Sequence, residues 1–234
     1  MSTLEPLFEI PATPLVPVKG ETGGYPVHRI FCVGRNYAAH AAEMGVEVDR
    51  EEPFYFTKPA SAITPTGSTI PYPPGTENFH YEMELVIAIG APAFRVSVED
   101  APKAVYGYAC GLDMTRRDLQ QASRVKQRPW DFGKAFERSA IISDITRAVD
   151  FPAIGKQRIW LKVGDEVKQD SHLSDMVWSV PEIVSHLSRF YHLAPGDLIY
   201  TGTPAGVGPV VAGDVITGGI DGLRDLALTI GPAE

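Results

Sequence analysis

A histidine and a glutamate stand three residues apart in the short stretch HAAE, residues 40–43. If this stretch is helical, His40 and Glu43 lie on one face and their side chains can touch. On spacing alone, a solvent-exposed surface pair is the commoner arrangement. The alternative is a dyad in which Glu43 orients His40 and His40 takes a proton from water. The choice depends on what other chemistry the chain offers.

Three carboxylates form a second group of interest. Glu82 and Glu84 are two residues apart in HYEMELVIAIG, so on a strand both side chains point to the same face. The apolar residues that follow favour burial, and buried neighbouring carboxylates repel each other unless a cation compensates them. Asp113 ends another apolar stretch, VYGYACGLD. The alternative for the two glutamates is a solvent-facing pair on an edge strand.

Carboxylates without a thiolate partner form a ligand set suited to Mg²⁺, Mn²⁺ or Ca²⁺ rather than Zn²⁺. We therefore predict a divalent-cation site at Glu82, Glu84 and Asp113. His80 shares the face of Glu82 if the strand extends that far, and a supporting or packing role is commoner there than a fourth ligand. A divalent ion with open positions can chelate a 2-oxo acid and polarise it as a Lewis acid.

The apolar pattern also predicts the elements that position these residues. Strands are expected at 28–34, 54–59, 68–74, 83–90 and 105–113. A short helix is expected at 37–45. Thr115, three residues before Asp118, resembles the N-terminal cap of a helix that continues to about Lys126. SVPE at 179–182 is a capping box that opens another helix.

The second half of the chain alternates short apolar stretches with Gly-Asp turns, which is typical of a β-roll or sandwich rather than of a βαβ repeat. We predict an α+β fold that is mostly β, with a few short helices. Residues 1–25, rich in Pro, Gly and Thr, are interpreted as an N-terminal arm or small extension. Residues 26–234 are interpreted as a single catalytic domain.

The composition is that of an ordinary globular protein, with 234 residues, 44% of them hydrophobic, and a formal net charge of −8. No Lys/Arg cluster dominates any stretch, which argues against a nucleic-acid-binding surface. The longest apolar run, 85–94, is too short to span a bilayer, and the N-terminus does not resemble a secretory signal. Cys32 and Cys110 are expected to be buried free thiols. We therefore expect a cytoplasmic protein that binds neither nucleic acid nor membrane.

Six motifs occur in the order and at the spacing of one enzyme family. They are GRNYAAH…E at 34–43, FTKP at 56–59, HYEMEL at 80–85, GLDMTRRDLQ at 111–120, RPWDFGKAF at 128–136 and TGTPAGVGP at 201–209. With them the chain resembles the fumarylacetoacetate hydrolase family from about residue 25 to its C-terminus. Other stretches, such as WSVPEIVSHLSR, are most similar to bacterial members that cleave fumarylpyruvate.

The resemblance implies a mixed β-roll or sandwich that assembles as a homodimer and uses Mg²⁺, or Mn²⁺ or Ca²⁺ in the same site. The implied enzyme is a hydrolase acting on carbon–carbon bonds in ketonic substances. Its small-molecule substrate would be an acylpyruvate, a 2,4-dioxo acid. Fumarylpyruvate and water would give fumarate and pyruvate, as in gentisate and other aromatic catabolism.

The matching positions also imply roles for individual residues. Glu82, Glu84 and Asp113 would hold the metal. His40 would be the general base, and Glu43 its partner.

The remaining matches concern the substrate. Lys134, which alone would be interpreted as a surface lysine, would stabilise the oxyanion formed at the attacked carbonyl, with Gln120 in support. Arg117 and Thr203 would bind the substrate carboxylate, and Arg35 is a weaker candidate for substrate contact.

Two features depart from this pattern or extend it. Arg116 stands where many relatives have a small residue, and a surface position is favoured for it over a contact with a second substrate carboxylate. The charged segment 44–52 is a candidate lid that orders over bound substrate.

Two rival functions remain. The first is a decarboxylase, isomerase or hydratase of a related oxo acid on the same fold. The His40–Glu43 dyad favours hydrolysis, because decarboxylation needs no attacking water. The second is a non-catalytic module that binds an oxo acid or a metal. The presence of the dyad, the three carboxylates and Lys134 argues against it.

Overall fold

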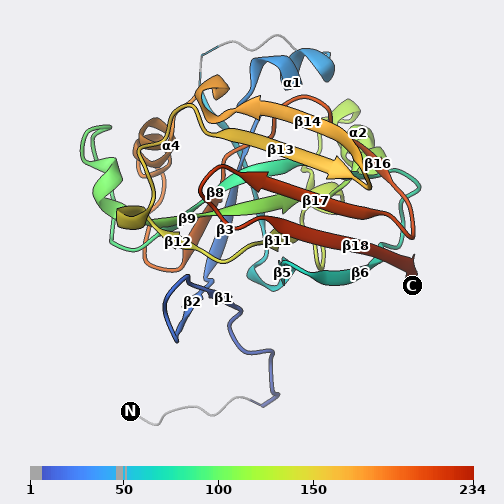
Figure 1. The fold of residues 1–234 in the computed structure, drawn as a ribbon, viewed down its shortest axis with the longest axis horizontal. Coiled ribbons are helices and arrows are strands. Elements are labelled where there is room, and N and C mark those ends of the chain that lie inside the picture. The colour runs from blue at the N-terminus through green and yellow to red at the C-terminus, as the bar shows by residue number, and fades with distance from the viewer. Residues whose placement is uncertain (1–6, 46–49, 51) are drawn as a thin grey trace.

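The largest sheet runs through the middle of the computed structural model, which describes residues 7–45, 50 and 52–234 (Figure 1). Its strand order is β4-β3-β15-β8-β9-β11-β5, and β12 also pairs with β9. These strands are β3 (Arg29–Gly34), β4 (Phe54–Lys58), β5 (Ile63–Pro65), β8 (Met83–Ile89), β9 (Val105–Asp113), β11 (Ala140–Ile142), β12 (Thr146–Arg147) and β15 (Asp197–Tyr200). The central strands β8 and β9 carry long apolar runs because both faces of this sheet are covered.

A second sheet covers one face of the first (Figure 1). Its order is β14-β13-β17-β18-β6, with β6 (Ser68–Tyr72), β13 (Arg158–Val163), β14 (Glu166–His172), β17 (Val215–Ile220) and β18 (Leu226–Ala233). The main hydrophobic core fills the space between the sheets. It includes Leu85 and Ile87 from β8, and Leu161, Ile216 and Leu228 from the second sheet, all fully buried.

Two smaller sheets complete the β structure. The first joins β10 (Thr115–Arg116), β7 (Phe79–Tyr81) and β16 (Gly208–Val210), and the second pairs β1 (Leu15–Pro17) with β2 (Gly24–Pro26). Val16 and Tyr25 of the β1–β2 pair belong to a buried cluster on the other face of the large sheet, with Ile30 and Cys32. The N-terminal region therefore packs on the body through this pair, and the domain boundary at residue 25 stays a prediction.

The helices are short. They are α1 (Ala38–Glu43), α2 (Arg117–Val125), α3 (Asp131–Lys134) and α4 (Val180–Leu187), with single-turn 3₁₀ segments at Ala60–Ala62, Ala101–Ala104, Ala148–Asp150 and Leu173–Asp175. The capping box predicted for α4 is confirmed, because the Ser179 backbone N–H donates to Glu182 Oε2 at 2.9 Å. The predicted fold class is confirmed as well: the chain is mostly β with a few short helices.

The cap predicted at Thr115 is wrong. Helix α2 begins at Arg117, and Thr115 lies in β10. Its hydroxyl donates to the Asp113 carbonyl at 3.1 Å and accepts a hydrogen bond from Lys134 at 2.7 Å. The Thr115 hydroxyl therefore bonds to Asp113 and Lys134 and not to the backbone N–H groups at the start of α2.

Two further expectations concern buried and apolar residues. Cys32 and Cys110 are buried and free, as predicted. Within the described residues, no helix is both long enough and apolar enough to cross a membrane.

Candidate active site

The three predicted metal ligands come together where β8 begins and β9 ends. Antiparallel pairing sets Glu84 opposite Gly111, and the Asp113 backbone N–H donates to the Glu82 carbonyl at 2.9 Å. One carboxylate oxygen from each of the three residues lies within 4.8 Å of the others, and all three side chains are buried. Glu82 itself lies in the break between β7 and β8. The structure therefore forms a compact cluster of oxygen donors.

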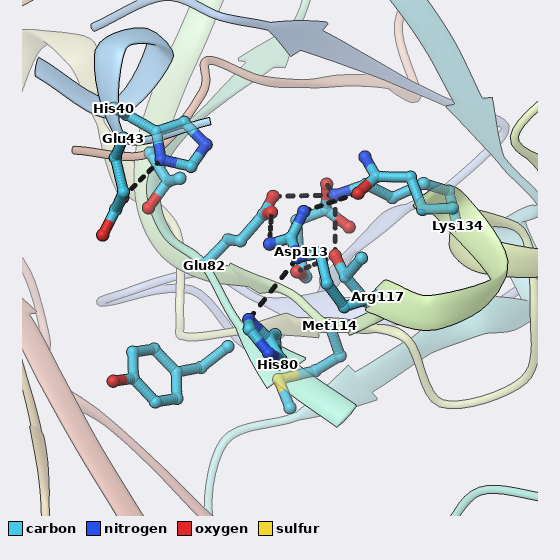
Figure 2. A network of polar contacts seen from close by, with 12 residues as sticks. His40, Glu43, His80, Glu82, Asp113, Met114, Arg117 and Lys134 are labelled. Atoms are coloured by element: carbon cyan, nitrogen blue, oxygen red, sulfur yellow. Dashed lines mark hydrogen bonds and ion pairs between the residues drawn. The ribbon is translucent and has the colours of Figure 1, made fainter. Parts of the chain in front are cut away.

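Lys134 contacts this cluster from α3 (Figure 2). Its Nζ lies 2.7 Å from Glu82 Oε2, 2.7 Å from Asp113 Oδ2 and 2.7 Å from Thr115 Oγ1. An ammonium group has three N–H donors, so all three are engaged. Lys58 from β4 is also buried, and its Nζ lies 2.8 Å from Asp113 Oδ1.

Arg117, the first residue of α2, approaches Glu82 from another side (Figure 2). Its guanidinium pairs with Glu82 Oε1 and donates to Gln120 Oε1 at 2.6 Å. Its Nε donates to His80 Nδ1 at 3.4 Å, and His80 Nε2 lies 2.8 Å from Asn78 Oδ1. Burial, with the positive charge of Arg117, lowers the pKa of His80 to about 4. His80 is therefore a neutral acceptor that supports Arg117.

The glutamates of the cluster differ in their electrostatic surroundings. Burial raises the pKa of Glu84 well above its ordinary value, and the nearby Asp113 and Glu82 raise it further. Burial also opposes ionisation of Glu82, but attraction to Lys134 and Arg117 outweighs it and holds the pKa of that carboxyl well below its usual range. Among the described residues, no Lys or Arg pairs with Glu84, whose Oε2 accepts the Gly202 backbone N–H at 2.8 Å.

This arrangement fits a hard divalent cation. The donors are carboxylate oxygens at mutual distances that one ion can span. In the part of the chain that the structure describes, Glu84 is the member without a positive partner, and an added cation would supply one. Glu82, Glu84 and Asp113 are therefore the residues that could hold a metal.

The His40–Glu43 contact expected from their spacing is present on α1. His40 Nδ1 lies 3.1 Å from Glu43 Oε2, and His40 is buried (Figure 2). Glu43 also accepts the backbone N–H of Gly206, at 3.2 and 3.3 Å from its two oxygens. Gly206 has φ +98°, and a Cβ there would lie 1.9 Å from the Lys168 carbonyl oxygen of β14. Position 206, whose backbone N–H bonds to Glu43 of α1, therefore requires glycine.

Thr203 lies in the same loop, and its hydroxyl has one partner from β14. Gln169 Nε2 donates to Thr203 Oγ1 at 2.8 Å and to the Pro204 carbonyl at 2.8 Å. Gln169 Oε1 accepts the Met83 backbone N–H at 3.0 Å, between the two glutamates. Because the Thr203 oxygen accepts this bond, its own proton is free to donate to a ligand.

One cavity, with about 540 Å³ of empty space including its open side, joins these groups. The predicted residues that line it are Arg35, His40, Glu82, Glu84, Arg117, Gln120, Lys134 and Thr203. Asp113 and Glu43 do not line the cavity themselves. Asp113 contacts the lining residue Lys134, and Glu43 contacts the lining residue His40. The cavity therefore places a potential base, an oxygen ligand cluster and several cationic donors around one space.

Comparison with known proteins decides the family. The model of the fumarylacetoacetate (FAA) hydrolase C-terminal domain matches residues 29–231. The chain belongs to the fumarylacetoacetate hydrolase family. A family member from a Ralstonia species, a fumarylpyruvate hydrolase, is 52% identical over 193 residues, which cover 82% of this chain and 100% of that protein.

Two other family members are also similar. Human mitochondrial oxaloacetate tautomerase FAHD1 is 42% identical over 205 residues, which cover 88% of this chain and 92% of that protein. The crystal structure of fumarylpyruvate hydrolase from Pseudomonas aeruginosa in complex with Mn²⁺ and pyruvate matches with a TM-score of 0.94 and 48% identity. That match covers 97% of this chain and 100% of that chain.

Several residues that line the cavity of this chain were not predicted from the sequence. They are Val33, Gly34, Met44, Phe56, Gln121, Arg124, Trp130 and Gly202. Arg124 had a usable signal, because it lies seven residues after Arg117 and hence on the same face of a helix. Gln169, which supports Thr203, had none, because its partners are far away in the sequence.

Arg116 does not line this cavity. Its guanidinium lies 4.2 Å from the ring centroid of Phe136, in a second cavity with Pro73 and Glu137. A contact between Arg116 and a second substrate carboxylate is therefore not supported. The suggested lid at 44–52 falls largely on residues 46–49 and 51, which lie outside the described part of the chain.

Proposed function

We propose that this chain is a divalent-metal-dependent hydrolase that cleaves the C3–C4 bond of an acylpyruvate, with fumarylpyruvate as substrate and fumarate and pyruvate as products. The observation that carries the proposal is that His40, which is paired with Glu43, lines the same cavity as Glu82 and Glu84 of the carboxylate cluster. The Ralstonia relative is named for this reaction, and the Pseudomonas structure contains Mn²⁺ and pyruvate.

The base chemistry follows from the orientation of His40. Its Nδ1 faces Glu43, so the other ring nitrogen, Nε2, is the one able to accept a proton from a water in the cavity. The Glu43 carboxylate stabilises the imidazolium that forms. The water oxygen then bonds to C4, the C3–C4 bond breaks with its electron pair passing to C3 as pyruvate enolate, and the imidazolium returns a proton to C3.

The neighbouring residues bind and orient the substrate. A divalent ion held by Glu82, Glu84 and Asp113 would supply Lewis-acid polarisation of the 2-oxo acid end. The Thr203 hydroxyl has a free proton for a substrate carboxylate, as described above. Because Gln120 Oε1 is held by Arg117, its amide N–H₂ is the part left to donate into the cavity.

Lys134 would stabilise the oxygen that becomes negative at C4. All three of its N–H groups already have acceptors at 2.7 Å. We therefore propose that Lys134 exchanges one of these bonds, to Glu82, Asp113 or Thr115, when it contacts substrate. Arg117 also already has partners, because its guanidinium bonds to Glu82 and Gln120.

The test is pyruvate release from fumarylpyruvate and acetylpyruvate by metal-stripped protein, with and without Mn²⁺ or Mg²⁺. We expect metal-dependent release, and a decrease of at least about 100-fold in kcat for His40→Ala, since general-base catalysis contributes about 10²–10⁴-fold. His192→Ala, at an exposed histidine outside the cavity, is the matched control. Unchanged release by His40→Ala would reject the proposed base.

A second candidate is interconversion of the oxaloacetate tautomers, because the human relative carries that name at 42% identity. The same base could move a proton between carbon and oxygen without an attacking water. If no acylpyruvate yields pyruvate but the enol form of oxaloacetate is converted, monitored by its ultraviolet absorbance, the second candidate replaces the first.

We further propose Mg²⁺ as the physiological ion, a homodimer as the assembly, a cytoplasmic location and a place in aromatic catabolism. The ion, the assembly and the catabolic role rest on the family resemblance, and the location rests on the composition and the two cysteines. Light scattering coupled to size-exclusion chromatography tests the dimer, and metal analysis of the protein purified without added metal tests the ion.

A further inference from the structure

One face of α2 lines the cavity from its interior to its open side. The residues on this face are Arg117, Gln120, Gln121 and Arg124, at the spacing of a helical face. Arg117 and Gln120 are buried, Arg124 is half-buried and Gln121 is exposed. At 1.5 Å per residue, Arg124 lies about 10 Å further along the helix than Arg117. Helix α2 therefore leads from the carboxylate cluster to the outside.

The two ends of this cavity carry different charged groups. The inner end is lined by Glu82 and Glu84, with Asp113 bound behind Lys134, and the 2-oxo acid end of the substrate is expected there. The outer part holds Arg124 and the exposed Arg35, so it is positively charged. A seven-carbon diacid bound by its oxo-acid end would extend its acyl group toward this positive region.

With respect to the described residues, Arg124 is the arginine of α2 that keeps most of its N–H donors without an acceptor. Its NH1 donates to the Met44 carbonyl at 3.2 Å, which uses one of the five N–H groups of a guanidinium. Arg117, in contrast, already pairs with Glu82 and Gln120. The fork of Arg124 can therefore still bind a carboxylate with two parallel hydrogen bonds.

Arg35 is the other cation of the outer part, but its side chain is placed differently. Its guanidinium lies 6.0 Å from the ring centroid of Phe54, and its backbone has φ +61°. Phe56 and Trp130, with ring centroids 5.8 Å apart, add an apolar wall to the same cavity. An unsaturated acyl chain that ends in a carboxylate matches an apolar wall followed by a cation.

We propose that Arg124 binds the distal carboxylate of a dicarboxylic acylpyruvate and so selects diacids over monoacids. This inference rests on the proposed hydrolase function. It assigns the choice of acyl group to α2, away from the residues that break the bond.

The test compares fumarylpyruvate with the analogue in which a methyl group replaces the distal carboxylate. The readout is the ratio of kcat/KM for the diacid to kcat/KM for the monoacid, with the two constants determined separately. For Arg124→Ala we expect this ratio to fall about 10- to 100-fold, the size of a lost hydrogen bond to a charged group. The loss should appear mainly as a higher KM for the diacid. Arg124→Lys, which keeps the charge, should recover part of it.

Lys126→Ala is the matched control, since it removes one positive charge two residues away, outside the cavity. For Lys126→Ala, the ratio of kcat/KM for the diacid to kcat/KM for the monoacid should stay within about twofold of wild type. This result would exclude a general effect of the protein's positive charge on diacid binding. Equal losses for both substrates in Arg124→Ala would overturn the inference and leave Arg124 only the role of holding α1 through Met44. A wild-type chain that cleaves neither substrate would overturn the hydrolase function and this inference together.

Discussion

Glu84 is the residue whose chemistry depends most on a bound cation. Its carboxyl is buried, faces two other carboxylates and has a backbone N–H of Gly202 as its hydrogen-bond partner. Without a metal, these surroundings favour its protonated form. A metal ligand must be ionised, so the proposed role of Glu84 as a ligand requires that it lose this proton.

The first prediction concerns pH and metal affinity. Mn²⁺ binding should release a proton from Glu84, and affinity should therefore rise with pH. Isothermal titration calorimetry in buffers of different ionisation enthalpy measures both quantities. Proton release that does not depend on Glu84, or affinity that falls as pH rises, would contradict this account.

Glu84→Gln provides the matching stability measurement on metal-free protein. The pKa of Glu84 in the folded state lies above its value in the unfolded state. Its contribution to the free energy of unfolding is therefore fully present below the unfolded-state pKa and is lost as pH rises through the folded-state pKa. The difference in the free energy of unfolding between wild type and Glu84→Gln should thus shift in favour of Glu84→Gln as pH increases.

At the scale of elements, the apolar pattern of the sequence predicts the central strands well. The ranges expected for β3, β8 and β9 agree with the structure, because continuous apolar runs suit strands buried on both faces. The range expected for the edge strand β4 also agrees closely. The break between β7 and β8 at Glu82 was not predictable. The Met83 N–H there bonds to the side chain of Gln169, 86 residues away.

In the site, too, local spacing predicts some contacts and not others. The spacing of His40 and Glu43 predicts their contact, and the alternation in EME predicts that Glu82 and Glu84 share a face. The three bonds of Lys134 could not be foreseen, because α3 meets β10 only in the folded chain.

The second prediction belongs to β14, which supports the Thr203 loop through Gln169. Gln169→Leu should lower the free energy of unfolding by roughly 2–4 kcal/mol, since it leaves the Met83 N–H buried without an acceptor and removes two further bonds. Urea denaturation measures this loss. Gln169→Glu keeps the acceptor for Met83 but replaces the donor to Thr203 and Pro204 with an oxygen, so it should disturb the Thr203 loop and raise KM. Equal effects of both variants would argue against separate roles for the two ends of the side chain.

For the whole molecule, the strand spacing predicts a β-roll or sandwich but not which strands become neighbours. Strand β15 pairs in parallel with β3, so Asp197 lies beside Arg29, far apart in sequence. Its carboxylate and the Arg29 guanidinium pair at 2.6 Å. Pairings of this kind depend on how the complete core packs, and local patterns carry no signal for them.

The third prediction is that a bound divalent ion stabilises the whole fold. At a free Mn²⁺ concentration about 100 times its Kd, the gain is about 2.7 kcal/mol. For a chain of this size this raises Tm by roughly 5–10 °C. Differential scanning calorimetry with Mn²⁺ and with a chelator measures the shift, and Glu84→Gln should lose most of it. A shift of the same size in Glu84→Gln would place the ion elsewhere.

The contact between Glu43 and Gly206 also has a consequence for how this enzyme can be altered. Any side chain at position 206 would collide with β14, so this position, which bonds to Glu43, is closed to substitution. At Gln121 and Arg124 of α2 there is more room for other side chains, because Gln121 is exposed and Arg124 is half-buried. Directed evolution toward new acyl groups should therefore accumulate its successful changes on α2 and leave Gly206 as it is.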